Sequence, residues 1–390
     1  MAKIGRPANG RFGRRDVIKG MFATSALLAT ACATIPSGTQ QTASSAGPER
    51  RGIVDTHAHP VRHPRRQGVN EAAIVDGMNE YGIDLTLLMS PPLPPDRPGG
   101  SVGGELTAAA RRHPGRLAFI GGGDSLNPML QETPPGAVSP AVLAAFQREA
   151  EAIARSGAAA FGEMAAEHFS SGRGNHPYES TNPDHPLLLA LADIAARESM
   201  PIDLHMEAVP RDMPFPANRR GAPNPDHLRE NISGLERLLA HNRQARIVWA
   251  HAGWDLTGER TVSLMRTLLD RHSNLYVNVK IDEHGDRRTE PFAPDGLVRS
   301  GWLALLGDFP DRFMVGSDQF YGEPLERLGF ARRFVNALPT DFAHRIASEN
   351  ARRIYRFSGR HTAGTAGTTT RSRSWATRHE KGAATEDRTG

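Results

Sequence analysis

The sequence predicts a single-domain α/β fold, a (β/α)8 TIM barrel over residues 52–358. The first observation is that, from Gly52 onward, short apolar runs alternate with longer helical patterns, which is typical of βα units around a parallel sheet. The second is that eight such runs occur, which favours a closed barrel over an open doubly wound sheet. A chain of 390 residues is also long enough for a barrel of about 250 residues with insertions.

The expected strands are the eight apolar runs, at residues 52–58, 84–90, 117–122, 158–164, 201–206, 246–251, 275–281 and 313–318. The expected helices lie at residues 70–81, 103–113, 138–155, 184–198, 226–241, 261–271, 295–306, 324–336 and 340–356. In the seventh strand, alternation places Tyr276, Asn278 and Lys280 in the barrel interior and the apolar residues between them against the helices. Lys280, the only lysine between residues 52 and 358, is then expected near the barrel mouth.

Residues 1–36 are predicted to be a twin-arginine export signal. Arg14 and Arg15 precede an apolar stretch of about a dozen residues, which is too short to span a bilayer and typical of a signal peptide. Cleavage before Cys32 fits both an A-x-A site and a lipoprotein box, so we expect a periplasmic protein that is either free or anchored by a lipid on Cys32. Residues 37–51 are expected to be a flexible linker and residues 359–390 a disordered tail.

The formal net charge of +4 belongs to the two ends of the chain. Residues 1–51 hold 8 basic and 2 acidic side chains and residues 360–390 hold 6 and 3, which leaves residues 52–359 at −5. A slightly acidic body argues against nucleic acid, so we expect a small-molecule partner and membrane contact only through the lipid anchor. Because Cys32 is the single cysteine, the chain can form no internal disulfide or cysteine-based metal site. The oligomeric state is left open.

Metal-ligating residue types close five of the predicted strands. His57 and His59 end the first strand and, being two residues apart, leave it on the same face. The other candidates at strand ends are Glu163, His205, His251 and Asp318. Each has a structural alternative, such as an ion pair for the glutamate, a core position for a histidine or a helix N-cap for the aspartate. Because a barrel gathers the carboxyl ends of its strands at one rim, the coincidence of six favours a metal centre.

These motifs resemble the metal-dependent amidohydrolase superfamily, in particular its amidohydrolase-2 group, which includes aminocarboxymuconate-semialdehyde decarboxylase and lactonases. The resemblance covers about residues 52–356 and is specific as an ordered set rather than in any single piece. It is carried by Asp55-Thr56-His57-Ala58-His59, Gly162-Glu163, Asp184-His185-Pro186-Leu187 leading to Pro201-Ile202-Asp203-Leu204-His205, His251-Ala252-Gly253, Gly316-Ser317-Asp318 and Glu349-Asn350-Ala351-Arg352-Arg353-Ile354-Tyr355. It implies an enzyme that uses one or two divalent cations, with Zn²⁺ as the expected metal.

The resemblance also implies a role for each ligand. The two histidines of the first strand would hold the first cation, and Asp318 would ligate it and accept a proton from its water. With Glu163 as a bridge, His205 and His251 would hold a second cation. Without a bridge, His205 would complete a single site and His251 would act as an acid/base or oxyanion-polarising group. The glycine before Glu163, which allows close approach of the backbone, favours two cations.

The expected reaction is hydrolysis of a C–O or C–N bond in a small carboxylated substrate such as a lactone, ester or amide. A divalent cation lowers the pKa of its water from about 15.7 toward 7 and polarises the carbonyl. The candidate substrate-binding residues are Lys280, Arg62, Arg173 and His168, with an ion pair to Asp282 or Glu283 as the structural alternative for Lys280. Two alternatives remain: a mononuclear non-oxidative decarboxylase of an aromatic or unsaturated carboxylic acid, and a non-catalytic surface lipoprotein that binds metal or ligand.

Overall fold

The computed structural model describes residues 52–60, 69–92, 102–171, 177–282 and 285–357. The predicted export signal, Cys32, the linker and the C-terminal tail lie outside these ranges, as do the candidate residues Arg62 and Arg173. These predictions therefore stay predictions. None of the helices in the described ranges has the length and apolar character that a bilayer crossing requires.

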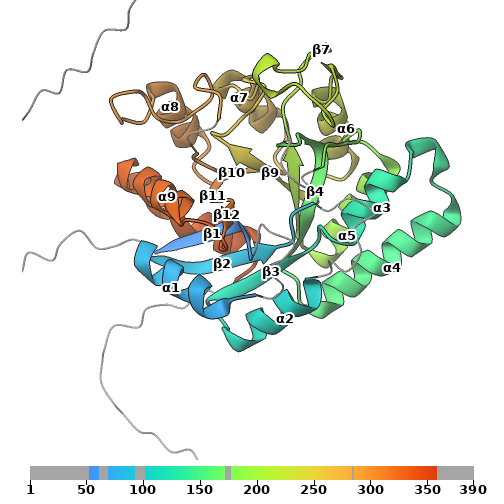
Figure 1. The fold of residues 1–390 in the computed structure, drawn as a ribbon, viewed down its shortest axis with the longest axis horizontal. Coiled ribbons are helices and arrows are strands. Elements are labelled where there is room, and N and C mark those ends of the chain that lie inside the picture. The colour runs from blue at the N-terminus through green and yellow to red at the C-terminus, as the bar shows by residue number, and fades with distance from the viewer. Residues whose placement is uncertain (1–51, 61–68, 93–101, 172–176, 283–284, 358–390) are drawn as a thin grey trace, which may run out of the picture. The chain divides into compact units, whose positions relative to one another are not determined.

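Eight parallel strands form a closed barrel, because the first strand pairs with both the second and the last (Figure 1). In order around the barrel they are β1 (Ile53–His59), β2 (Ile83–Met89), β3 (Leu117–Gly122), β4 (Ala160–His168), β6 (Pro201–Met206), β9 (Arg246–Ala252), β10 (Leu275–Val279) and β11 (Phe313–Val315). The prediction of a TIM barrel is confirmed, and each of the eight strands overlaps its predicted range.

Helices cover the outside of the barrel (Figure 1). They are α1 (Glu71–Tyr81), α2 (Gly103–Arg112), α3 (Leu126–Glu132), α4 (Pro140–Ser156), α5 (Pro186–Glu198), α6 (Ile232–His241), α7 (Val262–Arg271), α8 (Ser300–Asp308), α9 (Glu326–Ala337), α10 (Thr340–His344) and α11 (Asn350–Ile354). A π-helical turn, Arg345–Glu349, joins the last two into one helical segment, which matches the predicted helix at 340–356.

The structure differs from the predicted elements at several points, one of which is that the helix predicted from residue 295 begins at Ser300. The short helix α3 was not predicted, since Pro128 interrupts an already brief apolar pattern. The helix predicted from residue 226 begins six residues later, because β8 (His227–Leu228) pairs with β7 (Met213–Pro214) in a small hairpin. A second added hairpin, in which β5 (Glu179–Ser180) pairs with the end of β4, extends that strand beyond the predicted range.

Local signals explain where the helices begin and end, as α4 illustrates. The Ser139 side chain accepts a hydrogen bond from the Val142 amide, and Pro140 occupies the first helical position. The helix ends at Gly157, whose φ of 91° lies in the left-handed region that glycine adopts without strain. These caps hold α4 at the length that bridges β3 and β4.

The barrel encloses an apolar core near the end at which its strands begin. The side chains of this inner cluster include Val54, Leu85, Leu87, Met89, Ile120, Ala160, Val248 and Met314. Tyr276 packs against the same cluster, whereas Val277 and Val279 belong to the outer layer between sheet and helices, so the predicted alternation of this strand is confirmed. Residues of α11 join the inner cluster and close the end of the barrel where the strands begin. The polar residues of the interior are thereby left at the opposite, carboxyl-terminal rim.

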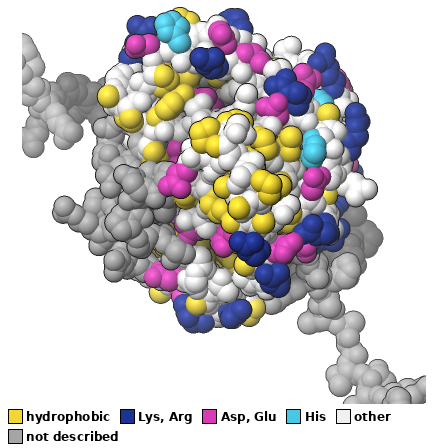
Figure 2. Space-filling model, turned by 90° about the vertical axis from the view of Figure 1, so that its right-hand side faces the viewer, with side chains coloured by type: hydrophobic (Ala, Val, Ile, Leu, Met, Phe, Trp, Pro, Cys, Tyr) yellow, Lys and Arg dark blue, Asp and Glu magenta, His cyan; other side chains and the backbone are white. Residues whose placement is uncertain are grey.

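Figure 2 shows one face of the molecule, on which basic and acidic side chains are interspersed and neither sign predominates. Many of the surface charges form ion pairs, such as Arg197 with Glu151 and Arg271 with Glu236. Exposed pairs of this kind contribute little to stability, about 0–1 kcal/mol each. The face in Figure 2 presents no continuous basic patch of the kind that binds a nucleic-acid backbone.

Candidate metal centre

All six predicted ligands come together at the carboxyl ends of the barrel strands. They are His57, His59, Glu163, His205, His251 and Asp318, and none of these side chains belongs to a residue more than 7% exposed. Two subsets bring ligand atoms within 4.8 Å of one another, namely His57 with His59 and Asp318, and His57 with Glu163 and His251. The convergence predicted from scattered sequence positions is therefore present in the structure.

The histidines of β1 present one ring nitrogen each to the site and turn the other toward an oxygen atom behind it. His59 Nδ1 lies 3.0 Å from the Met89 carbonyl oxygen, which can only accept, so this nitrogen carries the proton. His57 Nδ1 lies 3.1 Å from Asp203 Oδ1, and both residues are fully buried. The two Nε2 atoms face the site, and neither ring nitrogen of His57 has a hydrogen-bond partner among the described residues, so the contact with Asp203 is an ion pair. Such outer contacts are typical of metal-ligating histidines.

Asp318 turns one carboxylate oxygen toward these histidines. Its Oδ1 lies 3.1 Å from His59 Nε2 and 3.9 Å from His57 Nε2. Because His59 donates through Nδ1, a neutral ring would direct the Nε2 lone pair at a carboxylate oxygen. That arrangement is unfavourable unless a proton or a cation lies between the two atoms. The donor set, imidazole nitrogen and carboxylate oxygen, is one that Zn²⁺ and related ions prefer, so the residues fit a bound divalent cation.

Glu163 lies between the two pairs of histidines. Its Oε2 is 3.7 Å from His57 Nε2 and 3.6 Å from His59 Nε2. Its Oε1 is 2.8 Å from His205 Nδ1 and 3.5 Å from His251 Nε2. Burial opposes the charged form of Glu163, but the surrounding histidines hold its pKa well below the usual range. One carboxylate thus faces four imidazoles, two with each oxygen.

The glycine before this carboxylate is required by close packing. Gly162 has a φ of 154°, and a Cβ at this position would lie 2.9 Å from the Asp203 Cβ and 3.0 Å from the Asp203 carbonyl oxygen. No side chain fits at that distance. The close packing of Gly162 is therefore against Asp203 of β6, and the close approach to the metal centre expected from the Gly162-Glu163 sequence stays a prediction.

His251 and His205 complete the second side of the site. The His251 amide donates to Asn278 Oδ1 at 2.7 Å, which holds the residue at its positive φ of 68°. Burial and the nearby His57 lower the pKa of His251 well below its usual range, so the ring is neutral and can offer a lone pair. The pKa of His205 moves the other way: burial opposes its charged form, but Glu163 and Glu207 raise the pKa to about 9.

The predicted substrate-binding residues have different outcomes. Lys280 is 2% exposed, and its Nζ lies 2.6 Å from Asp318 Oδ2, one of the predicted ligands. Glu283, one of the two alternative partners considered for Lys280, lies outside the described residues. Asp282, the other, pairs with Arg327, which also donates to Asp318 Oδ2 at 2.7 Å. The His168 ring lies against that of His205, with centroids 4.6 Å apart, at the edge of the site.

The supporting roles of four polar residues were not predicted. These residues are Asp203, Glu207, Arg327 and Asn278, whose side-chain oxygen accepts from the His251 amide. Asp203 and Glu207 had a signal, because each is two residues from His205 and so shares its face of the chain as long as the strand continues. Arg327 had none, since it lies in a helix whose orientation depends on the closed barrel.

Comparisons with known proteins add names but no family assignment. No family model matches the sequence, and no curated protein matches it. Similar solved structures include a probable 2-pyrone-4,6-dicarboxylic acid hydrolase from Acinetobacter baumannii, with 13% identity, a TM-score of 0.45, and coverage of 78% of this chain and 99% of the other. IDCase from Metarhizium anisopliae has 13% identity, a TM-score of 0.46, and coverage of 78% and 97%.

A third similar structure is Amidohydrolase 2 from Bifidobacterium longum subsp. infantis, with 15% identity, a TM-score of 0.43, and coverage of 79% of this chain and 100% of the other. The family that the sequence motifs resemble is therefore present among the structures similar to this chain. Because the identities and TM-scores are low, the strand pairing of the chain itself establishes the barrel, and the ligand geometry carries the functional argument.

Proposed function

We propose that this protein is a metal-dependent hydrolase with two divalent cations, acting on a C–O or C–N bond of a small lactone, ester or amide. The observation that supports the proposal most is the position of Glu163, whose Oε2 faces the histidines of β1 and whose Oε1 faces His205 and His251. A carboxylate divided in this way between two sets of nitrogen ligands is suited to bridging two cations. A single ion would use one side of the site and leave the histidines on the other side without a cation to ligate.

A bound divalent cation supplies hydroxide at neutral pH and polarises the substrate carbonyl. The protein's own residues supply orientation and proton transfer. Asp318 is ionised, because the Lys280 ammonium and Arg327 guanidinium overcome the effect of burial and hold its pKa well below the usual range. Its Oδ2 is occupied by these two cations, so Oδ1 is the oxygen that can take a proton from attacking water and pass it to the leaving group.

The second candidate is a decarboxylase with one cation, and one observation favours it. The second ring nitrogen of His251, Nδ1, is buried and has no hydrogen-bond partner among the described residues, and none of their carboxylates lies beside it as Asp203 lies beside His57 Nδ1. A ring held less firmly on that side is suited to exchanging a proton with substrate rather than to holding a metal. In that case His205 completes a single site and His251 serves as the acid or base.

The number of ions per chain separates these candidates. Metal-free protein is loaded with Zn²⁺, excess ion is removed, and bound zinc is counted for the wild type and for Glu163→Gln. We expect two ions in the wild type and at most one in the variant. Glu179→Gln is a matched control, because Glu179 is also a buried glutamate (4% exposed) but pairs with Asn127, and we expect it to retain two ions.

Turnover then tests the reaction. The wild type and Asp318→Asn are assayed with a panel of lactones, esters and N-acyl amino acids, and with aromatic carboxylic acids for release of CO₂. We expect hydrolysis by the wild type and a loss of about 10³-fold or more in the variant, since the proton acceptor is removed. One ion per chain together with CO₂ release would instead establish the decarboxylase. Binding of metal without turnover of any class would contradict both and indicate a binding protein.

A further inference from the structure

The contacts on the outer side of Asp318 lead to an inference that rests on the proposed metal site. The backbone of Asp318 is fixed, because its amide donates to the His57 carbonyl oxygen at 2.8 Å. Rotation of the side chain would still let either carboxylate oxygen, or neither, face the histidines. The residue therefore needs a second set of contacts to present Oδ1 inward.

Two positively charged side chains, Arg327 and Lys280, make those contacts, and each of them contacts a further group. Arg327 donates from one guanidinium nitrogen to both the backbone oxygen and Oδ2 of Asp318, and its other terminal nitrogen lies 3.3 Å from Asp282 Oδ2. The Lys280 ammonium lies 2.6 Å from the same Oδ2 and 3.4 Å from the centre of the Trp254 ring. Charge-assisted hydrogen bonds and a cation–π contact of this kind restrict both partners.

We propose that Lys280 and Arg327 are positioning residues that clamp Oδ2 of Asp318, so that Oδ1 is presented to the cation beside His57 and His59. Lys280 thereby takes a role other than the substrate contact expected from its sequence position. The clamp also links the site to α9, which carries Arg327, and to the segment after β10, which carries Asp282.

The sign of the effect on metal affinity distinguishes positioning from simple electrostatics. Two positive side chains repel a divalent cation, so their removal would strengthen metal binding if charge were their only influence. If they orient Asp318, their removal leaves a buried carboxylate free to rotate and without its partners, and metal binding weakens. Loss of a contact that orients a ligand lowers metal affinity by about 10–100-fold.

Co²⁺ is the probe, because both its affinity and its visible absorption report ligand geometry. Metal-free wild type, Lys280→Met and Arg327→Met are titrated with Co²⁺ in competition with a chelator. We expect affinity for the first ion to fall by about 10-fold or more in both variants, with an altered absorption band. Arg327→Lys keeps the charge but cannot reach both carboxylates, and we expect part of the loss to persist.

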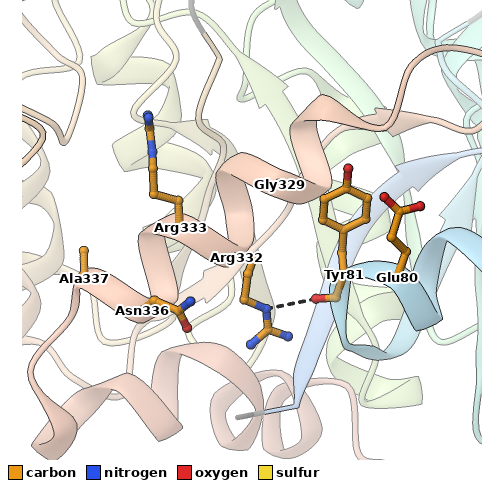
Figure 3. Close-up of a pocket in the computed structure, with 7 residues that line it drawn as sticks. All are labelled: Glu80, Tyr81, Gly329, Arg332, Arg333, Asn336 and Ala337. Carbon is orange, nitrogen blue, oxygen red and sulfur yellow. Dashed lines mark hydrogen bonds between the residues drawn. The ribbon is translucent and has the colours of Figure 1, made fainter. Parts of the chain in front are cut away.

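The matched control is Arg332→Met. Arg332 lies in the same helix as Arg327 and is more buried, and it donates to the backbone oxygens of Gly82 and of Tyr81, the latter shown in Figure 3. We expect this variant to be less stable and to bind Co²⁺ as the wild type does. Thermal unfolding of each metal-free variant checks that affinities are compared between folded proteins. Because Arg327 is partly exposed, we expect its substitution to disturb folding less than that of Lys280.

Two outcomes overturn the inference. If the Lys280 and Arg327 variants bind Co²⁺ with wild-type affinity and spectrum, Asp318 needs no clamp. If they bind Co²⁺ more tightly, the two basic side chains act on the metal by repulsion alone. Both outcomes leave the metal site intact and are distinct from failure of the proposed function, in which the wild type itself would bind no Co²⁺.

Discussion

Replacing Asp203 with asparagine tests whether outer contacts prepare the histidines for metal. Asp203 is fully buried, with Oδ1 lying 3.1 Å from His57 Nδ1 and Oδ2 accepting from Asn278 Nδ2 at 3.3 Å. Asparagine has nearly the same shape but a single acceptor oxygen, so one of these two donors loses its acceptor. The substitution also removes the negative charge that, against the effect of burial, helps to raise the pKa of His57.

Two magnitudes follow from these contacts. A buried donor without a partner costs about 1–3 kcal/mol, so the free energy of unfolding of the metal-free protein should fall by that amount. A less basic and less firmly held His57 is a weaker ligand, and loss of an outer partner lowers metal affinity by about 10–100-fold. The second effect corresponds to about 1.4–2.8 kcal/mol of binding free energy.

Denaturant unfolding of the metal-free proteins and Co²⁺ titration of the folded proteins measure the two effects separately. Asn274→Ala is the control, because Asn274 is buried and donates to the Leu239 and Ala245 carbonyl oxygens away from the site. We expect it to lose stability and keep its metal affinity. Co²⁺ affinity of Asp203→Asn within twofold of the wild type would refute the reasoning, because His57 would then need no outer partner.

Two further predictions concern stability. Burial raises the pKa of Glu179 to about 8, so between about pH 4.5 and 8 the folded protein holds a proton there that the unfolded chain releases. The free energy of unfolding should therefore fall over this range, by up to about 1.4 kcal/mol for each pH unit. Glu179→Gln should therefore gain stability over the wild type at about pH 8.5 relative to about pH 5.5, whereas exposed Glu105→Gln should show no such difference in denaturant unfolding. Gly162→Ala should lower the free energy of unfolding by roughly 2–4 kcal/mol because of the positive φ at this position and the contact with Asp203. If the variant unfolds like the wild type, the explanation by strain is wrong. Gly104→Ala, which meets nothing within 4 Å, should be neutral or stabilised by about 0.5–1 kcal/mol.

The barrel was predictable because two sequence signals indicate several of its strands. An apolar run such as Ile247-Val248-Trp249-Ala250 indicates a buried strand, and the histidine that follows it indicates the rim at which the strand ends. Elements held mainly by tertiary contacts carried no comparable pattern. The two-residue strands β5 and β7 exist because β4 and β8 offer them partners, and no periodicity of so short a segment could indicate this.

The ligands were predictable for the same reason as the strands, whereas their supports were only partly so. Asp203 alternates with His205 and could have been inferred, but its partner His57 lies in another strand, and only the barrel order brings the two together. The pairing of Lys280 with Asp318 similarly depends on how β10 lies beside β11. Sequence patterns give the face of a strand on which a residue lies, and the register between strands decides its partner.

The pairing of β1 with β11 has a consequence for biosynthesis. Asp55 accepts hydrogen bonds from both the amide and the hydroxyl of Ser317, residues separated by 262 positions, directly beside His57 and Asp318. The seam of the ring is thus also where its first and last ligands meet. A ribosome must deliver nearly the entire barrel before the first and last of the proposed ligands can share an ion, so the site beside His57 and His59 should form only once the chain is almost finished.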